Sequence, residues 1–471
     1  MYSELNESLK EHSYFQDKRL SHRLGHIVEQ IGNNFGQSLP RCGGNHTETQ
    51  AIYRFMANEK VTPSSLYQSD NSRIKERLSA LLHAQTFLVV SDKTELDYST
   101  TKSRHKLGSL NFEKRRGFYA QSLMIMGSTG CPEGLIRQSH YNHEADEVGT
   151  SRKLSSKSLS EKPIEDKESY EWIADLEEIH TLFGQMSQHR FVHITDREGD
   201  IFERFAAHRF DHIHFLTRLK HDRSLVGSDL NVKAFISQVP PQGCMSLVVK
   251  DPKTGEKRLA QLEISYTTCT LDVPSQLKKY QKQKAYQPVK VQVVQVKEIT
   301  QQTEQLKPFE PLYWLLITSL PIENLEQALE VIHFYTLRWR IEDFHIVLKQ
   351  GASIEKLQFE EEHQLKNAIV VYSIVAIQVL KLRYLSGTNP ELPILQAGIE
   401  QQDVYIAVQY LEKVRKIKVQ MPQILTIAFF CQLLALIATG NKKNTGMRAL
   451  WKGYREFSLI KEIFKANLHA P

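Results

Sequence analysis

The hydrophobic and polar residues between Tyr335 and Lys349 repeat with the period of an α-helix. The apolar residues recur at intervals of four, three and four and form one stripe: Leu337, Ile341, Phe344 and Leu348. The polar side chains of Arg338, Glu342 and Lys349, with Tyr335 one turn earlier, fall on the opposite face. The pattern predicts a helix that buries one face and presents two cations, a carboxylate and a phenol on the other. A surface helix also carries charges, so this pattern does not identify a site by itself.

Two apolar runs upstream each stop at an aspartate. Residues 87–91 read F-L-V-V-S before Asp92, and residues 191–195 read F-V-H-I-T before Asp196. Runs of this length and composition predict buried strands. Ligands of an open α/β sheet bind outside the carboxyl ends of its strands. We therefore expect both carboxylates at or just past the ends of two strands, in a ligand site.

Asp92, Asp196 and the helix residue Glu342 suit a divalent metal ion. Mg²⁺ takes a few carboxylate oxygens and keeps its remaining positions for water and substrate phosphate. Two such ions about 4 Å apart clamp the attacking and leaving oxygens of an in-line phosphoryl displacement. Three acids brought together by the fold would therefore support two-metal phosphoryl transfer.

The motifs around these acids resemble those of the bacterial DDE transposases with a Y-x2-R-x3-E-x6-K signature, the group of the Tn-five-type cut-and-paste transposases. The signature residues occur here at every family spacing: Tyr335, Arg338, Glu342 and Lys349. The family motif D-T-T-x-L-x-Y appears at residues 92–98 as D-K-T-E-L-D-Y, with Lys93 in place of a threonine. D-R-E-x-D-I appears at residues 196–201 as D-R-E-G-D-I, and W-L-L-L-T-S at 314–319 as W-L-L-I-T-S. The resemblance runs from about residue 17 to about residue 459.

This resemblance implies a role for each of the matching residues. The catalytic and metal-binding residues would be Asp92, Asp196 and Glu342, holding two Mg²⁺ ions for which Mn²⁺ substitutes. The residues that contact DNA near the active site would be Tyr335, Arg338, Lys349, Trp314 and Arg218. Trp314 would stack on a flipped base during hairpin formation, although a tryptophan in an apolar strand is most often a core residue.

The resemblance also implies a reaction. The enzyme would nick the ends of a mobile element, form and resolve DNA hairpins, and transfer the freed strands into target DNA by a cut-and-paste mechanism. Double-stranded DNA of the element ends and of the target would be its partner, and a homodimer would act in the DNA complex.

Residues 1–70 predict a small helical module with basic and aromatic side chains. Such side chains suit phosphate contact and groove insertion, and a helical domain with solvated charges fits the residues equally well. The resemblance identifies the module with the family domain that recognises transposon ends. It implies DNA contacts by Arg19, Arg23 and Arg54.

The remaining elements predict an α/β fold. Alternating apolar runs predict these additional elements around the second acid: strands 117–126, 134–141 and 212–219, and helix 169–187. Three early strands followed by alternation with helices is the ribonuclease-H-like order of elements, although the order alone is compatible with many α/β folds. The acids on the first strand, the fourth strand and a later helix make it specific. We expect this core at residues 71–370, an all-β insertion within it at about 222–312, and a helical C-terminal domain at 371–471 that mediates dimerisation in the family.

Composition bears on the partner, the cellular compartment and membrane contact. The 471 residues include 60 Lys and Arg against 54 Asp and Glu, and the net charge of +6 is compatible with nucleic acid without requiring it. The five scattered cysteines lack metal-site spacing and indicate a reducing compartment. The apolar stretches 368–380 and 424–437 are shorter than a span of about 20 residues and predict buried helices. We expect a cytoplasmic protein, nucleoid-associated on DNA, without membrane contact.

Other classes of protein stay open at this point. A nuclease of the same fold that only hydrolyses DNA would not need Trp314 or the polar face of the signature helix. A catalytically inactive DNA-binding relative or inhibitor would not need the three acids. A structural protein with chance acids would not need ordered motifs.

Overall fold

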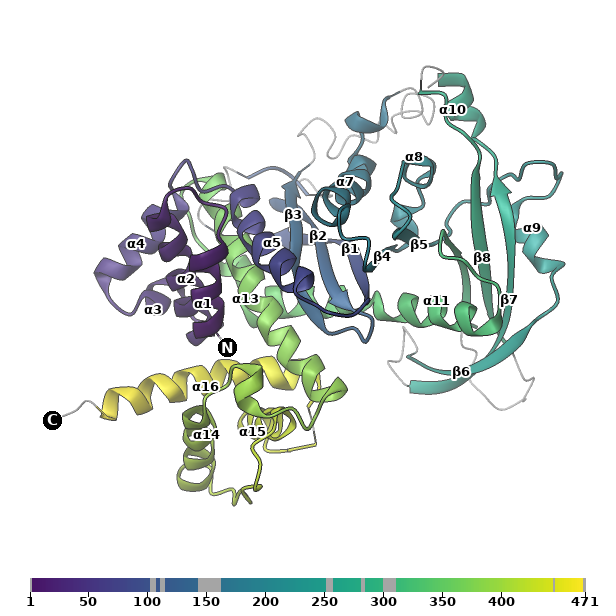
Figure 1. Cartoon of the computed structure of the whole chain (residues 1–471). Helices are drawn as coiled ribbons and strands as arrows, with labels where there is room; N and C mark the ends of the chain where they lie inside the picture. Colours follow the sequence, from purple (N-terminus) through teal and green to yellow (C-terminus); the bar gives the residue numbers. More distant parts are fainter. Residues whose placement is uncertain are drawn as a thin grey trace. The chain divides into compact units, whose positions relative to one another are not determined.

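The computed structural model describes residues 2–101, 107–110, 115–142, 162–250, 257–280, 284–299, 311–443 and 445–468. The chain divides into two compact units, each built from separate segments (Figure 1). Unit 1 comprises Met1–His83, Asp92–Ser151 and Trp339–Pro471, and unit 2 comprises Ala84–Ser91 and Arg152–Arg338.

Within the described residues the strands form one mixed sheet of nine, in the order β3-β2-β1-β4-β5-β9-β8-β7-β6. β4 pairs in parallel with β1 and β5, whereas β2 with β3 and the run from β5 through β9, β8, β7 and β6 are antiparallel. The bounds are β1 (Thr86–Asp97), β2 (Gly117–Gly127), β3 (Pro132–Tyr141), β4 (Arg190–Thr195), β5 (Ile213–Arg218), β6 (Gly243–Lys250), β7 (Lys257–Leu271), β8 (Val289–Glu298) and β9 (Tyr313–Thr318). The predicted strands are therefore present, and the α/β class is confirmed.

β1 is longer than predicted. Its parallel pairing with β4 ends at Val90 opposite Ile194, where the sequence places the strand end. The strand itself continues to Asp97, so Asp92 lies within β1 instead of at its end. The apolar run of residues 87–91 predicts only the part of β1 that is buried on both faces of the sheet.

Short helices separate the strands of unit 2. They are η3 (Ile164–Asp166), η4 (Glu168–Tyr170), α7 (Glu171–Phe183), η5 (Arg197–Gly199), α8 (Phe202–Ala206), α9 (Val232–Ser237), α10 (Ser275–Tyr280) and α11 (Leu325–Leu337). α9 and α10 lie within the insertion, so the expectation that it is all β is wrong. Their six-residue lengths explain why periodicity does not reveal them.

The insertion shares a hydrophobic core with the strands on which it is built. Phe205 and Phe215, from α8 and β5, cluster with Leu271, Val293 and Ile317 from β7, β8 and β9. Apolar side chains at alternate positions of these strands face one side of the sheet and bury their area against the helices. The β-rich segment is thus a continuation of the core sheet.

The helices of unit 1 gather around α13. They are α1 (Tyr2–His12), α2 (Lys18–Asn33), α3 (Leu39–Gly43), α4 (His46–Met56), α5 (Pro63–Ser79), α12 (Arg340–Ile346), η7 (Val347–Gly351), η8 (Ile354–Lys356), α13 (Glu362–Thr388), η9 (Ile394–Ala397), α14 (Gln401–Lys413), α15 (Ile427–Thr439) and α16 (Met447–Leu468). α13 contacts α2, α4, α5, α15, α16 and β3 (Figure 1). By length and composition α13 could cross a membrane, but 78% of its most apolar window is buried inside the protein. The prediction of a buried helix there is confirmed.

The signature segment is not one continuous helix. α11 ends at Leu337, α12 begins at Arg340, and residues 347–351 wind into a π-helical turn closed by Ala352 N–H donating to the Val347 carbonyl at 2.8 Å. The predicted apolar stripe is nevertheless buried, with Ile341, Phe344 and Leu348 at 0% exposure. The buried residues follow the helical period of the sequence. That period continues across the break after Leu337, so the sequence pattern does not reveal the break.

His193 generates a prediction about acid stability. Its ring is fully buried in β4, and this burial lowers its pKa well below the ordinary value of 6.5. The unfolded chain takes up a proton near pH 6.5 that the folded chain does not, so stability is complete above that pH and is lost below it. When the pH falls from 7.5 to 5, the wild type should lose unfolding free energy at this site. We expect that loss to be about 2 kcal/mol smaller in His193→Gln, which has no imidazole to protonate. Urea denaturation at each pH measures this difference, and parallel curves would contradict it.

Candidate active site and nucleic-acid interface

The register of β1 and β4 relates the two predicted catalytic aspartates. Asp92 follows Val90 by two residues and Asp196 follows Ile194 by two, and Val90 pairs with Ile194. Each aspartate therefore stands two residues past the paired segment of its own strand, Asp92 within β1 and Asp196 after the end of β4. Both side chains are half-buried. Asp196 thus follows the end of its strand as the apolar run predicts, whereas Asp92 does not, and a shared ligand site stays a prediction.

A tight turn follows Asp196. Its Oδ1 accepts the Glu198 N–H at 2.8 Å and caps the 3₁₀ turn η5. Asp92 Oδ1 accepts the N–H of the adjacent Lys93 at 2.9 Å. Each carboxylate thus engages its own backbone through one oxygen, and these local hydrogen bonds orient the side chains.

A buried ion pair fixes the far end of this turn. Asp200 Oδ1 accepts Arg223 Nε–H at 2.8 Å, and Asp200 Oδ2 accepts the N–H groups of Lys220 and His221 at 2.7 Å each. The Arg223 side chain is 8% exposed and that of Asp200 0%. The sequence analysis did not predict this ion pair. Asp200, the second aspartate of the D-R-E-G-D-I motif, was the one feature of the sequence that pointed to it.

Aromatic and cationic side chains gather in unit 2. The Trp314 and Tyr335 rings meet edge to face, with centroids 5.2 Å apart. Burial raises the pKa of Tyr335, while the charges of Arg338 and Arg218 oppose that rise and Asp196 adds to it. Burial likewise lowers the pKa of Arg218, whose Nη2 donates to the Tyr313 carbonyl at 2.8 Å. These residues, predicted separately from distant motifs, therefore form one electrostatic neighbourhood around Asp196.

Glu342 lies in unit 1, in the first turn of α12. Its neighbours anchor this short helix to α13: the Arg340 guanidinium stacks 3.8 Å from the Tyr384 ring centroid, and the Tyr384 hydroxyl donates to Asp343. Glu342 itself is half-buried. The charged residues beside Glu342 thus serve the packing of the helix that carries it.

Lys349 contacts the extended part of β1 in unit 1. Its ammonium donates to the Glu95 carbonyl at 2.7 Å and lies 3.6 Å from the Glu355 carboxylate. Glu355 also accepts the Asp97 N–H at 2.9 Å. Lys349 therefore links the π-helical turn to the strand that contains Asp92.

The chemistry of the acids fits a hard divalent ion, because carboxylate oxygens on rigid strand and helix positions are ligands that Mg²⁺ accepts. Asp196, Trp314, Arg218, Tyr335 and Arg338 belong to unit 2, whereas Asp92, Glu342 and Lys349 belong to unit 1. Among the residues that the structure describes, no three His, Cys, Asp or Glu side chains converge on one point. A metal site shared by the three predicted acids therefore stays a prediction.

The N-terminal helices present a basic hollow. It measures about 630 Å³ and is lined by Lys10, Lys18, Arg19, His22, Arg23, His26 and Glu48. The Arg19 side chain is 91% exposed and pairs with its helix cap Asp17 at 2.9 Å, and Arg23 lies 2.8 Å from Glu48. Arg54 does not line this hollow; it lies on α4, where Nη2 donates to Gln50 at 3.3 Å. Arg19 and Arg23 therefore line the same hollow, and Arg54 does not.

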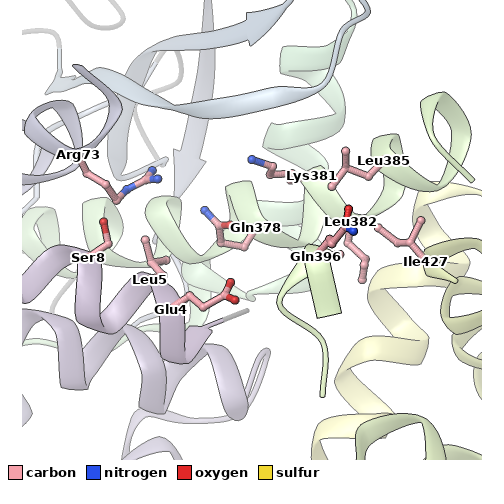
Figure 2. Close-up of a pocket in the computed structure, with 11 residues that line it drawn as sticks. Glu4, Leu5, Ser8, Arg73, Gln378, Lys381, Leu382, Leu385, Gln396 and Ile427 are labelled. Carbon is pink, nitrogen blue, oxygen red and sulfur yellow. The ribbon is translucent and has the colours of Figure 1, made fainter. Parts of the chain in front are cut away.

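A separate pocket of about 230 Å³ lies among α1, α5, α13 and α15 (Figure 2). Its two cations are neutralised inside the protein: Arg73 Nε donates to Asp70 at 2.9 Å, and Lys381 lies 3.2 Å from Glu133. No predicted site residue lines this pocket, and we assign it no role in the chemistry.

Comparison with known proteins matches two parts of the chain. Residues 5–61 match the model of a transposase DNA-binding family, and residues 194–377 match that of the transposase DDE domain. The first interval contains the basic hollow's α2, the second contains Asp196 and Glu342, and Asp92 lies between them. Among solved structures, the chain is similar to a cryo-EM structure of the piggyBac transposase synaptic complex with hairpin DNA, at 9% identity and a TM-score of 0.34, over 97% of this chain and 74% of that one.

The buried Asp200–Arg223 pair generates a stability prediction. Arg223→Met would leave the Asp200 carboxylate buried without its cation, so we expect a loss of about 3–5 kcal/mol of unfolding free energy. Lys220→Met removes the same charge from an exposed neighbouring position and should change stability by only about 0.5 kcal/mol. Urea denaturation compares the two variants, and equal effects would show that burial of the pair does not matter.

Proposed function

We propose that the chain moves a DNA element by a cut-and-paste mechanism. Its residues 5–61 and 194–377 match a transposase DNA-binding family and the transposase DDE domain, which implies DNA cleavage by phosphoryl transfer. In this proposal it nicks the element ends, forms and resolves hairpins, and joins the freed 3′ ends to target DNA. The observation that supports the proposal is the parallel pairing of β1 with β4, because the chain has Asp92 and Asp196 each two residues past the last paired residues. The catalytic domain is proposed to be ribonuclease-H-like, which the sheet order β3-β2-β1-β4-β5 supports.

Asp92, Asp196 and Glu342 would hold two Mg²⁺ ions, with Mn²⁺ as a substitute. When bound, the ions would lower the pKa of a nucleophilic water and neutralise charge on the scissile phosphate. The chain itself has to supply fixed carboxylates, because phosphoryl transfer depends mainly on positioning and charge neutralisation. The cap of η5 at Asp196 and the anchoring of α12 by Tyr384 supply that rigidity.

The cations beside the acids would bind the DNA backbone. Arg338 and Arg218 flank the Tyr335 phenol, and a guanidinium binds phosphate through two parallel hydrogen bonds. Lys349 would provide a point charge on the side of β1. Trp314 is half-buried and offers part of its ring to a displaced base, for which stacking recovers part of the unstacking free energy.

The N-terminal helices would recognise the element ends. Arg19 and Arg23 on α2 line one basic hollow, and phosphate contacts of this kind fix the register of a protein on duplex DNA. Arg54 would contribute from α4. Binding through such contacts weakens steeply with salt, because each neutralised phosphate releases a counterion.

The active species would be a homodimer on DNA, in the cytoplasm of a bacterium and on its nucleoid. Exposed apolar side chains of the C-terminal helical region support a protein interface there. They include Leu395 at 59%, Tyr405 at 55% and Ile424 at 66% exposure. A hydrolytic nuclease or an inactive DNA-binding relative is the alternative, and the following experiments separate these possibilities.

Glu342→Gln tests the catalytic assignment. The amide keeps the shape of the side chain and removes the negative charge, so we expect cleavage of labelled element-end DNA to fall at least about 100-fold while end binding is unchanged. Glu326→Gln, the same change at an exposed position of α11, is the matched control. Gel assays with and without Mg²⁺ give both readouts. Cutting retained by Glu342→Gln would exclude Glu342 as a ligand, and binding without any cutting by the wild type would favour an inactive relative.

Trp314→Ala tests the hairpin step. Without the indole ring, the first nick should proceed and the yield of hairpin should fall about tenfold, because stacking on an aromatic face is worth about 1–3 kcal/mol per base. Tyr313→Ala, at the exposed adjacent position of β9, is the control and should leave the hairpin yield unchanged. Denaturing gels of end DNA resolve nick and hairpin. An unchanged yield in Trp314→Ala would return Trp314 to a packing role, and nicking by the wild type without a hairpin would favour the nuclease.

A further inference from the structure

A polar network is buried in unit 2, next to β1 and β4. Ser91 immediately precedes Asp92, and successive side chains of a strand point to opposite faces of the sheet. The Ser91 hydroxyl lies 2.8 Å from Asp175 Oδ2 on α7 and 2.7 Å from His193 Nε2 on β4. All three residues are 0% exposed. The residue beside one proposed ligand is thus tied to the neighbouring strand and to a covering helix.

The chemistry of these groups fixes the direction of each hydrogen bond. A carboxylate only accepts, so the Ser91 hydroxyl donates its one proton to Asp175. The Ser91 oxygen then accepts from His193, which requires the neutral tautomer with its proton on Nε2. A leucine or an alanine at any of these positions would break the chain of donors and acceptors.

The network continues to the turn after Asp196. Arg204 Nη2 donates to the His193 carbonyl at 3.1 Å, and Nη1 donates to Gly199 O at 3.3 Å and to Thr217 Oγ1 at 2.7 Å. The Thr217 hydroxyl lies 2.9 Å from that of Thr195, which directly precedes Asp196. Arg204, Thr195 and Thr217 are all 0% exposed. One buried path therefore runs from Ser91, before Asp92, to both sides of Asp196.

Packing alone does not account for this path. A carboxylate and a guanidinium are withdrawn from water within it, and apolar side chains of similar volume usually fill such a space at lower free energy. The charge of Asp175 stabilises the protonated form of Arg204 and so raises its pKa, against the lowering by burial. The hydrogen bonds of this network restrict how the ends of β1 and β4 can move relative to each other.

We propose that Asp175, Ser91, His193 and Arg204 are positioning residues that hold Asp92 and Asp196 at the mutual spacing a divalent ion requires. This inference rests on the proposed function, because it assumes that the two aspartates share an ion. Groups that orient metal ligands typically change metal affinity about 10- to 100-fold when they are removed. Loss of the network should therefore weaken ion binding in a protein that still folds and still binds element ends through its N-terminal helices.

Binding of Mn²⁺ alone, measured by calorimetry on the full-length protein, tests the proposal without relying on catalysis. Ser91→Ala should raise the Mn²⁺ dissociation constant about tenfold. Ser122→Ala is the matched control: Ser122 is also 0% exposed in a strand of the sheet, and its hydroxyl accepts Gln138 Nε2–H at 3.1 Å. It should lose similar stability and leave Mn²⁺ binding unchanged. His193→Gln, which can still donate to Ser91, should bind Mn²⁺ more tightly than His193→Leu.

The outcomes separate the network from the proposed function. Equal Mn²⁺ affinities in Ser91→Ala and Ser122→Ala, or no difference between the two His193 variants, would overturn the positioning role while the metal site stands. Wild-type Mn²⁺ binding that is unaffected by Asp92→Asn would overturn the metal site, and the positioning role with it. A raised dissociation constant in Ser91→Ala and His193→Leu only, with thermal unfolding showing folded protein, would establish the network.

Discussion

The parallel pairing of β1 with β4 is the contact on which the proposed chemistry depends. Asp92 and Asp196 are 104 residues apart in the chain, and each follows a member of the Val90–Ile194 pair by two residues. A shift of one residue in this register would send every following side chain of one strand to the opposite face of the sheet. The apolar side chains of both strands are buried, so such a shift would expose the core, and hydrophobic burial thereby protects the geometry of the acids.

Buried charges surround this pair of strands, and each is neutralised within unit 2. Asp200 is satisfied by Arg223 and two backbone N–H groups, and Arg204 by carbonyl and hydroxyl oxygens with the charge of Asp175 nearby. Withdrawing ions from water is unfavourable unless the remaining hydrogen bonds are made. These groups hold the turn from Asp196 to Asp200 at both ends, which suits an enzyme whose catalysis depends on fixed positions more than on covalent chemistry by the protein.

The signature segment divides its tasks between the two units. Tyr335 and the cap residue Arg338 lie at the C-terminal end of α11 in unit 2, near Trp314 and Arg218, whereas Glu342 lies in the first turn of α12 in unit 1. The helix break after Leu337 and the π-helical turn at Lys349 let side chains of one short segment serve different surroundings. The internal contacts of Lys349 with Glu95 and Glu355 show that a proposed DNA contact also has structural partners in the protein alone.

The sequence by itself determined the strands, the buried α13, the order of the acids and the motifs that match a transposase, because periodicity and spacing are local properties of the chain. It did not predict α9 and α10, the continuation of β1 past Asp92, or the break in the signature helix, because short helices and strand extensions depend on neighbours distant in sequence. Only the tertiary structure revealed that Ser91, Asp175, His193 and Arg204 form one network. The sequence does not show which partners a serine, a histidine or an arginine will have. Once the fold buries these side chains, an unsatisfied hydrogen-bonding group is unfavourable enough to select a single arrangement.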